Sequence, residues 1–360
     1  MVRIGIAGLG DHIGIAAMHI DGYLRQKDKC VITALYDIIP GQGEKYKERF
    51  NLSEAEVCSS YEELLSKCDA LSICTPNVAH VPLIVEALKA GKHVLCEKPF
   101  STDSASCEDA LIYERLSHRV CMIGLCYRGI PAFRYIRKLL GEGELGKIYY
   151  VRESQGGNRI ADLNVKREWR MTEALSGPGA VADFGSHMLD MTDWILRPLC
   201  GPITQVQCME GTFVTERASE MGAGLEKVDN DDVAVFNVRL ESGTLVSFSA
   251  SRIGCDHTFE VYGEKGYLAY LGNHFQVVMH KYGEKRKELE VPKELYYDEA
   301  MPETQFFENF FFEVKEFLAS IIDGAPVTTT FSRGYYIQRL IDALQLSADT
   351  DTVIDIDFEE

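Results

Sequence analysis

The sequence predicts an α/β protein: a doubly wound parallel sheet at the N-terminus, followed by an α+β domain on an open, mostly antiparallel sheet. Three observations support this fold class. Short apolar runs alternate with helical patterns through the first third of the 360 residues, which indicates βαβ units. After about residue 145 the apolar runs are longer and are joined by turns that contain glycine, as in antiparallel hairpins. A glycine-rich turn also separates the first strand from the first helix.

The elements of the first part follow from apolar runs bounded by turn residues. The expected strands are 2–7, 31–36, 70–74, 93–96 and 120–125. The expected helices are about 14–26, 41–50, 60–67, 79–90 and 103–117. Because strands and helices alternate, we expect helices on both faces of a parallel sheet and a first domain over residues 1–126.

The second part is predicted from its hairpins and its late helices. The expected hairpins pair 236–240 with 245–250, and 259–262 with 267–271. Two helices follow, at about 306–322 and 333–348, and Gly324 after the first of them suits a left-handed cap. We therefore expect one α+β domain over residues 127–360.

Composition narrows the class of protein. Hydrophobic residues make up 46% and charged residues 26% of the chain, and the longest apolar runs have the length of a strand, so no membrane span is expected. The N-terminus enters a strand pattern without the features of an export signal, so we expect a cytoplasmic protein. The formal charge of −18 makes nucleic acid and anionic lipid poor partners.

The eleven cysteines are scattered, with no CxxC pair, which suits buried small side chains in a reducing compartment. Only Cys96, beside Glu97-Lys98, lies near suspected chemistry. An apolar surrounding does not favour a nucleophilic thiol, so we interpret it as structural.

The turn after the first strand contains Gly8-Leu9-Gly10-Asp11 and then Gly14. Its first two glycines allow main-chain amides to approach a pyrophosphate at the start of a helix. Gly14 comes four residues after Gly10 rather than three, so the loop is one residue longer than the usual dinucleotide fingerprint. A purely structural glycine turn is the competing interpretation.

Asp37 ends the second expected strand. A carboxylate there can accept hydrogen bonds from the adenosine ribose, and it repels the 2′-phosphate of NADP. No Arg or Lys follows in Ile38-Ile39-Pro40, so the position favours NAD over NADP. The competing interpretation is an ordinary turn aspartate before Pro40.

Polar residues also follow the third and fourth long strands. Thr75, Asn77 and His80 come after 70–74, and Lys98 comes after 93–96. Ligands of doubly wound sheets bind outside the carboxyl ends of the strands, so these side chains are expected at one site.

A further polar group is predicted on a helix that starts at the glycine turn 177–179 and runs to about Leu196. Asp183, His187 and Asp190 are spaced three and four residues apart and so form one stripe beside an apolar stripe. Alone, this pair of Asp and His also suits a surface pair or a structural histidine. Metal ligation is a minor option because no further ligand set is evident.

Oxidation of an alcohol by a nicotinamide needs a base near neutral pKa and stabilisation of the developing alkoxide. His187 suits the first role and Lys98 the second, and these roles are exchangeable. Asp183 can orient either a hydroxyl or the imidazole.

With these motifs in view, the chain resembles the glucose-fructose oxidoreductase/inositol dehydrogenase/rhizopine catabolism (Gfo/Idh/MocA) family of NAD(P)-dependent oxidoreductases. The resemblance covers nearly the whole chain. Its motifs are AGLG (7–10), TPNVAH (75–80), AGKHVLCEKP (90–99), EWR (168–170), SGPGAVADFGSH (176–187) and IIDGAPV (321–327).

The resemblance implies a Rossmann domain, then a substrate domain that commonly builds dimers or tetramers through its sheet. It implies that Lys98, Asp183 and His187 are catalytic. It further implies a set of residues along the NAD path, some matched only in certain members. These are Gly8, Leu9, Gly10, Asp11, Asp37, Thr75, Asn77, His80, Glu97, Lys98, Trp169 and Arg170.

The leading hypothesis is an NAD-dependent dehydrogenase that takes hydride from a secondary hydroxyl of a ring polyol, sugar or glycoside. The stretches Gln155–Arg159, Lys166–Arg167 and Tyr127–Arg128 supply polar groups that could discriminate among hydroxyls. In one variant, tightly bound NAD is recycled in sugar–sugar exchange or in glycoside cleavage. Two competing hypotheses are a reductase acting on a carbonyl or imine and a non-catalytic NAD-binding sensor or regulator.

Overall fold

The computed structural model describes residues 1–10, 14–220, 222–273, 275–296 and 305–358. By its internal contacts the chain divides into two compact units. The first is Met1–Cys126 with Ala300–Tyr335, and the second is Tyr127–Glu299 with Tyr336–Glu360. In the described part of the chain, no helix has the length and apolar character needed to cross a membrane.

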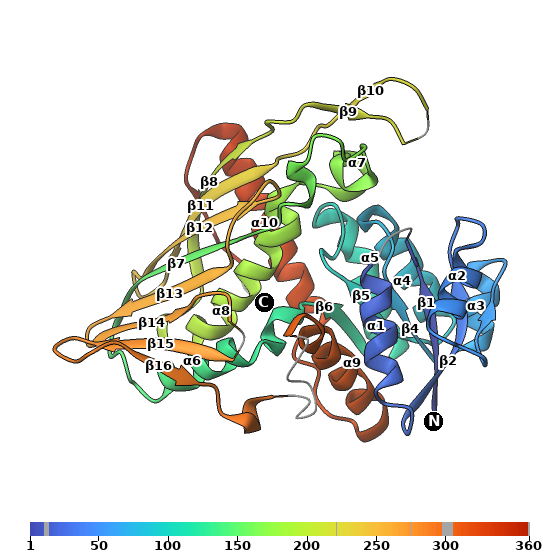
Figure 1. The fold of residues 1–360 in the computed structure, drawn as a ribbon, viewed down its shortest axis with the longest axis horizontal. Helices are drawn as coiled ribbons and strands as arrows, with labels where there is room; N and C mark the ends of the chain where they lie inside the picture. The colour runs from blue at the N-terminus through green and yellow to red at the C-terminus, as the bar shows by residue number, and fades with distance from the viewer. Residues whose placement is uncertain (11–13, 221, 274, 297–304, 359–360) are drawn as a thin grey trace. The chain divides into compact units, whose positions relative to one another are not determined.

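The first unit is built on a six-stranded parallel sheet in the order β3-β2-β1-β4-β5-β6, with helices on both faces (Figure 1). The hydrogen-bonded neighbours are all parallel. Its strands are β1 (Val2–Ala7), β2 (Cys30–Tyr36), β3 (Glu56–Val57), β4 (Ala70–Ile73), β5 (His93–Glu97) and β6 (Cys121–Gly124). This confirms the predicted doubly wound sheet, to which the structure adds the two-residue strand β3.

Helices cover the sheet and begin where the sequence places turns. They are α1 (Ile15–Leu24), α2 (Gln42–Arg49), α3 (Tyr61–Lys67), α4 (His80–Lys89) and α5 (Glu108–Ser117). Ser60 caps α3 by accepting a hydrogen bond from the Glu63 amide at 3.1 Å, as the preference for serine at helix starts predicts.

A later helix also belongs to the first unit, which differs from the expected single domain over 127–360. Helix α9 (Gln305–Asp323) packs against α1. Its Val314, Phe317 and Leu318 are buried in the same apolar core as Ile4 and Ile20. Helix α9 belongs to this unit because its apolar face is buried against α1, far away in the sequence. Gly22 of α1 allows the close contact, since a Cβ at position 22 would lie 3.1 Å from Val314 Cγ2.

The second unit is built on a nine-stranded sheet in the order β16-β15-β14-β13-β7-β12-β11-β8-β17. Among the described strands of this sheet, only β7 and β12 pair in parallel, which confirms a mostly antiparallel sheet. The strands are β7 (Ile148–Gly156), β8 (Ile203–Gly211), β11 (Val233–Leu240), β12 (Leu245–Ser251), β13 (Thr258–Gly263), β14 (Gly266–Tyr270), β15 (Gln276–Lys281), β16 (Lys287–Glu290) and β17 (Ile354–Asp355). A separate two-stranded sheet holds β9 (Glu216–Ala218) and β10 (Leu225–Lys227). Both predicted hairpins are present, as β11–β12 and β13–β14.

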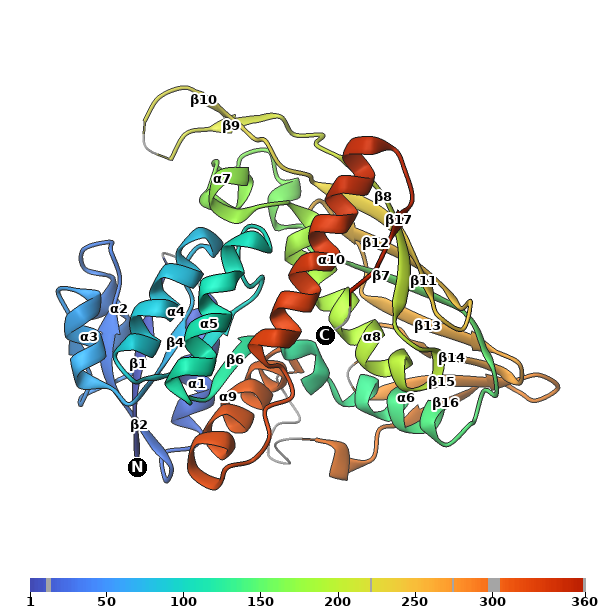
Figure 2. The same cartoon turned by 180° about the vertical axis from the view of Figure 1, so that it is seen from behind.

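Helices α6 (Pro131–Gly141) and α8 (Ser186–Cys200) lie over one face of this sheet (Figures 1 and 2). Strand β11 shows why: its residues alternate between buried and exposed, so one face is apolar and covered. The short helix α7 is Glu173–Ser176, and the long helix α10 is Phe331–Thr350.

The predicted helix after 177–179 differs from expectation in its first turn. Val181–Gly185 forms a π-helical turn, and the α-helix starts only at Ser186. Such turns widen the helix locally and are frequent at functional sites. Asp183 lies within this turn and His187 lies just after it, so the two do not have the ordinary α-helical offset.

The placement of α9 gives a stability prediction. Phe317 is fully buried, whereas Ile322 near the end of the same helix is 46% exposed. Phe317→Ala should lower the free energy of unfolding by about 3–5 kcal/mol because it leaves a core cavity. Ile322→Ala should lower it by less than about 1 kcal/mol. Urea unfolding followed by circular dichroism measures both, and equal costs would contradict the packing of α9 described above.

Candidate active site

In the first unit, side chains after β2 and in α2 fix the glycine turn by hydrogen bonds to its main-chain amides and carbonyls. Asp37 Oδ2 accepts hydrogen bonds from the amides of Leu9, at 2.6 Å, and Gly10, at 3.2 Å. From α2, Gln42 donates to the Gly10 carbonyl at 2.9 Å and the Tyr46 hydroxyl donates to the Leu9 carbonyl. Asp37 therefore follows β2 directly, and its side chain holds the glycine turn.

The two glycines serve different purposes. Gly8 has φ +83°, and a Cβ there would lie 2.7 Å from the Thr75 amide nitrogen, so a side chain does not fit. Gly10 has φ +70° and open space where a Cβ would be, so its main chain can be approached closely. The predicted Asp11 lies outside the described residues.

The end of β4 supplies a polar atom suited to a ligand. The Thr75 hydroxyl is buried and has no hydrogen-bond partner in the described structure. Asn77, 6% exposed, starts the next helical turn. An unsatisfied hydroxyl next to an open glycine turn fits a ligand rich in hydroxyls and phosphate, as a dinucleotide is.

His80 has a different place from the one expected. Its side chain is fully buried, and its Nδ1 and Nε2 lie 2.9 Å from the carbonyl oxygens of Pro99 and Thr75, respectively. Burial lowers the pKa of His80, against the opposing effect of the two carbonyls. The ring thus lies between the loop after β4 and the loop after β5, with one nitrogen toward a carbonyl of each. A neutral ring donates a hydrogen bond to one of the two carbonyls.

Glu97 also faces the interior, although the resemblance places it along the NAD path. It is 5% exposed and bonds to His19 at 2.8 Å. Its second oxygen accepts the Lys98 amide at 3.2 Å. Lys98 itself is half-buried and follows the end of β5, where the strand pattern places it.

In the second unit, Asp231 anchors the turn that carries Asp183. Its carboxylate accepts hydrogen bonds from the amides of Gly179 and Val181, and its carbonyl accepts one from Ala180. A Cβ at position 179 would lie 1.8 Å from the Asp231 carbonyl oxygen, so only glycine fits there.

Arg252 places a cation beside Asp183. Its guanidinium is buried, donates to Asn230 at 3.1 Å and to the Arg170 carbonyl at 2.6 Å, and lies 3.7 Å from Asp183 Oδ2. The Asp183 carboxylate therefore has a fixed positive charge within ion-pair distance. Sequence reasoning missed Arg252 and Asp231. The signals were an arginine after the strand 245–250 and the acidic run 229–232.

His187 is 6% exposed, and its ring stacks on Tyr127 with centroids 4.0 Å apart. The Tyr127 hydroxyl accepts a hydrogen bond from Gln155 at 2.5 Å. The structure therefore brings His187, Tyr127 and Gln155 together, and Tyr127 and Gln155 are among the residues expected to discriminate hydroxyls.

Asp190 and Arg128 have a structural role instead. They form a bidentate pair, at 2.6 and 2.8 Å, and both side chains are buried. The expected polar stripe therefore ends at His187. Trp169 and Arg170 form a short turn in which the guanidinium lies 4.3 Å from the indole centroid, and both side chains are half-buried.

Comparisons with known proteins agree with this architecture. Residues 2–125 match the family model described as "Oxidoreductase family, NAD-binding Rossmann fold", and residues 133–269 match the "GFO/IDH/MocA C-terminal domain". The chain belongs to the Gfo/Idh/MocA family of NAD(P)-dependent oxidoreductases, and its cofactor is NAD.

Two curated relatives illustrate the family. The levoglucosan dehydrogenase of Pseudarthrobacter phenanthrenivorans is 26% identical, covering 79% of each chain. The inositol 2-dehydrogenase of Rhizobium meliloti is 25% identical, covering 95% of each. Among solved structures, a levoglucosan dehydrogenase complex with NADH and levoglucosan has a TM-score of 0.88 at 22% identity, covering 99% of this chain and 100% of that one. This last likeness shows a shared fold.

The position of Asp37 gives a prediction on cofactor choice. Asp37→Asn keeps an oxygen for the turn amides and removes the negative charge, so repulsion of a 2′-phosphate falls. The ratio of the NADPH and NADH dissociation constants should move about tenfold toward NADPH. Calorimetric titration with each nucleotide measures it. Asp28→Asn, an exposed control in the same unit, should leave the ratio unchanged, and an unchanged ratio in Asp37→Asn as well would assign Asp37 to the turn alone.

Proposed function

We propose that this protein is an NAD-dependent dehydrogenase that oxidises a secondary hydroxyl of a ring polyol, sugar or glycoside. One observation carries the proposal: the buried His187 stacks on Tyr127, next to a turn whose Asp183 faces a fixed guanidinium. A hydroxyl-rich substrate needs such polar groups, because a substrate without hydroxyls would leave them unpaired. The named activities of the relatives, on levoglucosan and on inositol, support this substrate class.

The proposed mechanism divides the work among three side chains. Bound NAD supplies the hydride acceptor. His187 or Lys98 takes the hydroxyl proton as hydride leaves the carbon, and the other stabilises the charge that develops on oxygen. Asp183, whose carboxylate lies 3.7 Å from the Arg252 guanidinium, orients the substrate hydroxyl or the imidazole.

Substitution of the two candidate proton carriers tests the mechanism. Lys98→Met and His187→Asn should each lower kcat by about 10²–10⁴-fold, because each loses proton transfer or charge stabilisation. In His187→Asn, NADH affinity should stay within about threefold, because His187 is not among the residues expected along the NAD path. Turnover is measured as reduced-nicotinamide absorbance against a panel of inositols, hexoses and glycosides.

Lys138→Met is the control for that experiment because Lys138 is exposed on α6 and should leave kcat unchanged. Full activity in both Lys98→Met and His187→Asn would overturn the mechanism. Silence of the unmodified protein across the panel, with NAD retained after purification, would favour the recycled-cofactor reaction over a dehydrogenase. Silence with no nucleotide binding would contradict a working dinucleotide site.

We also propose that the face of the large sheet opposite α6 and α8 is the contact between copies in a homodimer or homotetramer. Aromatic rings form a ladder across neighbouring strands there, with successive centroids 6.1, 5.5 and 5.3 Å apart. The ladder comprises Tyr150, Tyr262, Tyr267 and His280. Aromatic side chains are enriched in protein interfaces.

Sedimentation velocity tests this assignment. The unmodified protein should sediment as a dimer or tetramer. Tyr262→Glu should lower the mass toward one chain, because the interface would then hold an unpaired charge. A monomeric unmodified protein, or an unchanged mass in Tyr262→Glu, would argue against this face.

A further inference from the structure

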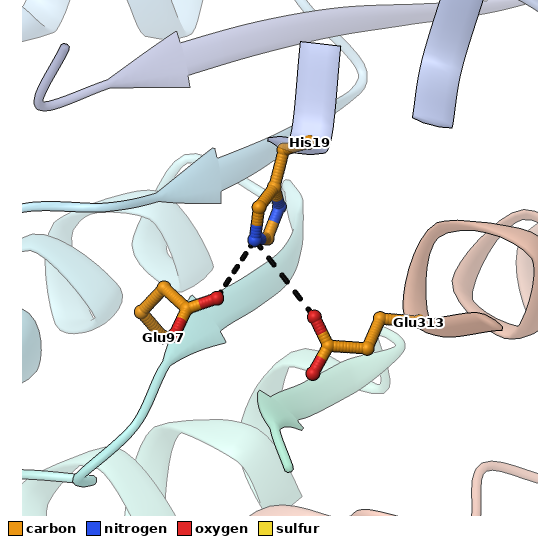
Figure 3. Close-up of side chains that lie close together, drawn as sticks. All are labelled: His19, Glu97 and Glu313. Atoms are coloured by element: carbon orange, nitrogen blue, oxygen red, sulfur yellow. Dashed lines mark hydrogen bonds and ion pairs between the residues drawn. The ribbon is translucent and has the colours of Figure 1, made fainter. Parts of the chain in front are cut away.

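Three ionisable side chains from distant parts of the sequence meet in the interior of the first unit. They are His19 from α1, Glu97 from β5 and Glu313 from α9 (Figure 3). All are buried. His19 Nε2 lies 2.8 Å from Glu97 Oε1 and 3.8 Å from Glu313 Oε2, and one donor atom of each residue lies within 4.8 Å of the others. The proposed mechanism uses none of them directly.

A hydrogen-bonded chain leads to Glu97. The Tyr23 hydroxyl lies 2.8 Å from Ser72 Oγ, which lies 2.9 Å from His19 Nδ1. One orientation satisfies every member: Tyr23 donates to Ser72, Ser72 donates to His19 Nδ1, and His19 Nε2–H donates to Glu97. In this orientation Glu97 is the carboxylate acceptor at the end of the chain.

Glu97 in turn sets the main chain at Lys98. Its Oε2 accepts the Lys98 amide, and Oε1 would lie 2.9 Å from a Cβ at Gly124. The absent side chain at position 124 therefore leaves the room that the carboxylate occupies. A displacement of the Glu97 carboxylate would release the Lys98 amide.

Glu313 has a different environment from Glu97. It is 0% exposed, and neither of its oxygens has a hydrogen-bond partner in the described structure. Burial first, and then the charges of Glu97 and Glu316, raise the pKa of Glu313, while Lys98 opposes them. The titratable groups that face it or contribute to its surroundings are His19, Tyr23, Cys74, Glu97, Lys98, Cys126 and Glu316.

We propose that Glu313 is a positioning residue held as a neutral carboxylic acid, which leaves Glu97 as the single charged carboxylate that fixes the Lys98 turn. Two buried carboxylates this close cannot both ionise without strong repulsion. Ionisation of Glu313 would push Glu97 away from His19 and from the Lys98 amide. The consequence for Lys98 chemistry rests on the proposed function, whereas the protonation state does not.

Thermal unfolding across pH tests the protonation state without any assay of activity. A carboxyl whose pKa is raised by folding keeps its proton in the folded state and loses it in the unfolded state, so stability falls as pH rises above about 4.5. Glu313→Gln removes this loss. The Tm of Glu313→Gln minus that of the unmodified protein should therefore grow by about 2 °C per pH unit between pH 5 and 8.

Glu86→Gln is the matched control, because it makes the same chemical change at an exposed position in the same unit. Its Tm difference should not vary with pH. A Tm difference for Glu313→Gln that stays constant, or becomes more negative, as the pH rises from 5 to 8 would overturn the proposal, because it would show that folding does not hold the proton on Glu313. If Glu313→Gln fails to fold, Glu313→Met is the second test. An apolar side chain should be able to replace a neutral acid that has no hydrogen-bond partner. Failure of both variants to fold would also overturn the proposal.

A bound cation is the competing explanation for two buried carboxylates beside a histidine. It predicts that a chelator lowers the Tm of the unmodified protein and that added Zn²⁺ raises it, with neither effect in Glu313→Gln. Either effect in the unmodified protein would overturn the neutral-acid assignment. We expect no change of Tm with chelator or Zn²⁺.

A second measurement addresses positioning. If the dehydrogenase reaction is confirmed, the alkaline fall of kcat should begin at least one pH unit higher in Glu313→Gln than in the unmodified protein, with KM for NAD unaffected. An identical pH profile together with the predicted Tm shift would leave the neutral acid in place and refute its influence on Lys98. Absence of all turnover would contradict the proposed function. It would not affect the neutral-acid assignment, which the Tm measurement tests by itself.

Discussion

The parallel ladder of the first unit is the constraint on which the NAD-binding half of the site depends. Strand β1 pairs with β2 on one side and β4 on the other, so the loops after Ala7, Tyr36 and Ile73 leave the sheet at the same edge. Gly8 continues this register: its amide donates to the Tyr36 carbonyl at 3.0 Å, and the Cys74 amide donates to the Ala7 carbonyl at 2.8 Å. Because there is no space for a Cβ at position 8, only glycine lets the turn pack this closely against the loop after β4.

The loops at this edge are held by buried or half-buried polar side chains that contact the main chain. His80 lies between two carbonyls, Asp37 accepts two turn amides, and Glu97 accepts the Lys98 amide. In the second unit Asp231 does the same for the turn of Asp183. Substitution of one of these side chains is costly, because it leaves a buried main-chain group unpaired, and that penalty exceeds the net stability that the hydrogen bond contributes.

Much of the fold could be predicted from local sequence. Apart from β3, the strands and helices α1–α5 of residues 1–126 follow from apolar periodicity and glycine turns, as do both hairpins, because each depends on residues close in sequence. The packing of α9 against α1 could not be predicted in this way. The apolar pattern of 306–322 shows that a face is buried and does not say against which partner.

The candidate site shows the same division. The end of a strand pointed to Lys98, and helical spacing pointed to His187. The structure has Lys98 half-buried after β5 and His187 buried on α8, and their catalytic roles stay a prediction. The pattern did not show that Glu97 and His80 would turn inward, because a polar side chain in a motif suits a ligand contact and a main-chain contact equally well. Arg252 was missed because its importance comes from Asp183, sixty-nine positions earlier in the chain.

The return of α9 to the first unit has a consequence for synthesis on the ribosome. The first 126 residues emerge with the surface of α1 that Val314, Phe317 and Leu318 later cover still open to water. At about 5–20 residues per second, α9 follows some tens of seconds later at the slower rate. During that interval the nascent chain presents apolar surface, which makes this first unit a natural client for chaperones that bind emerging chains.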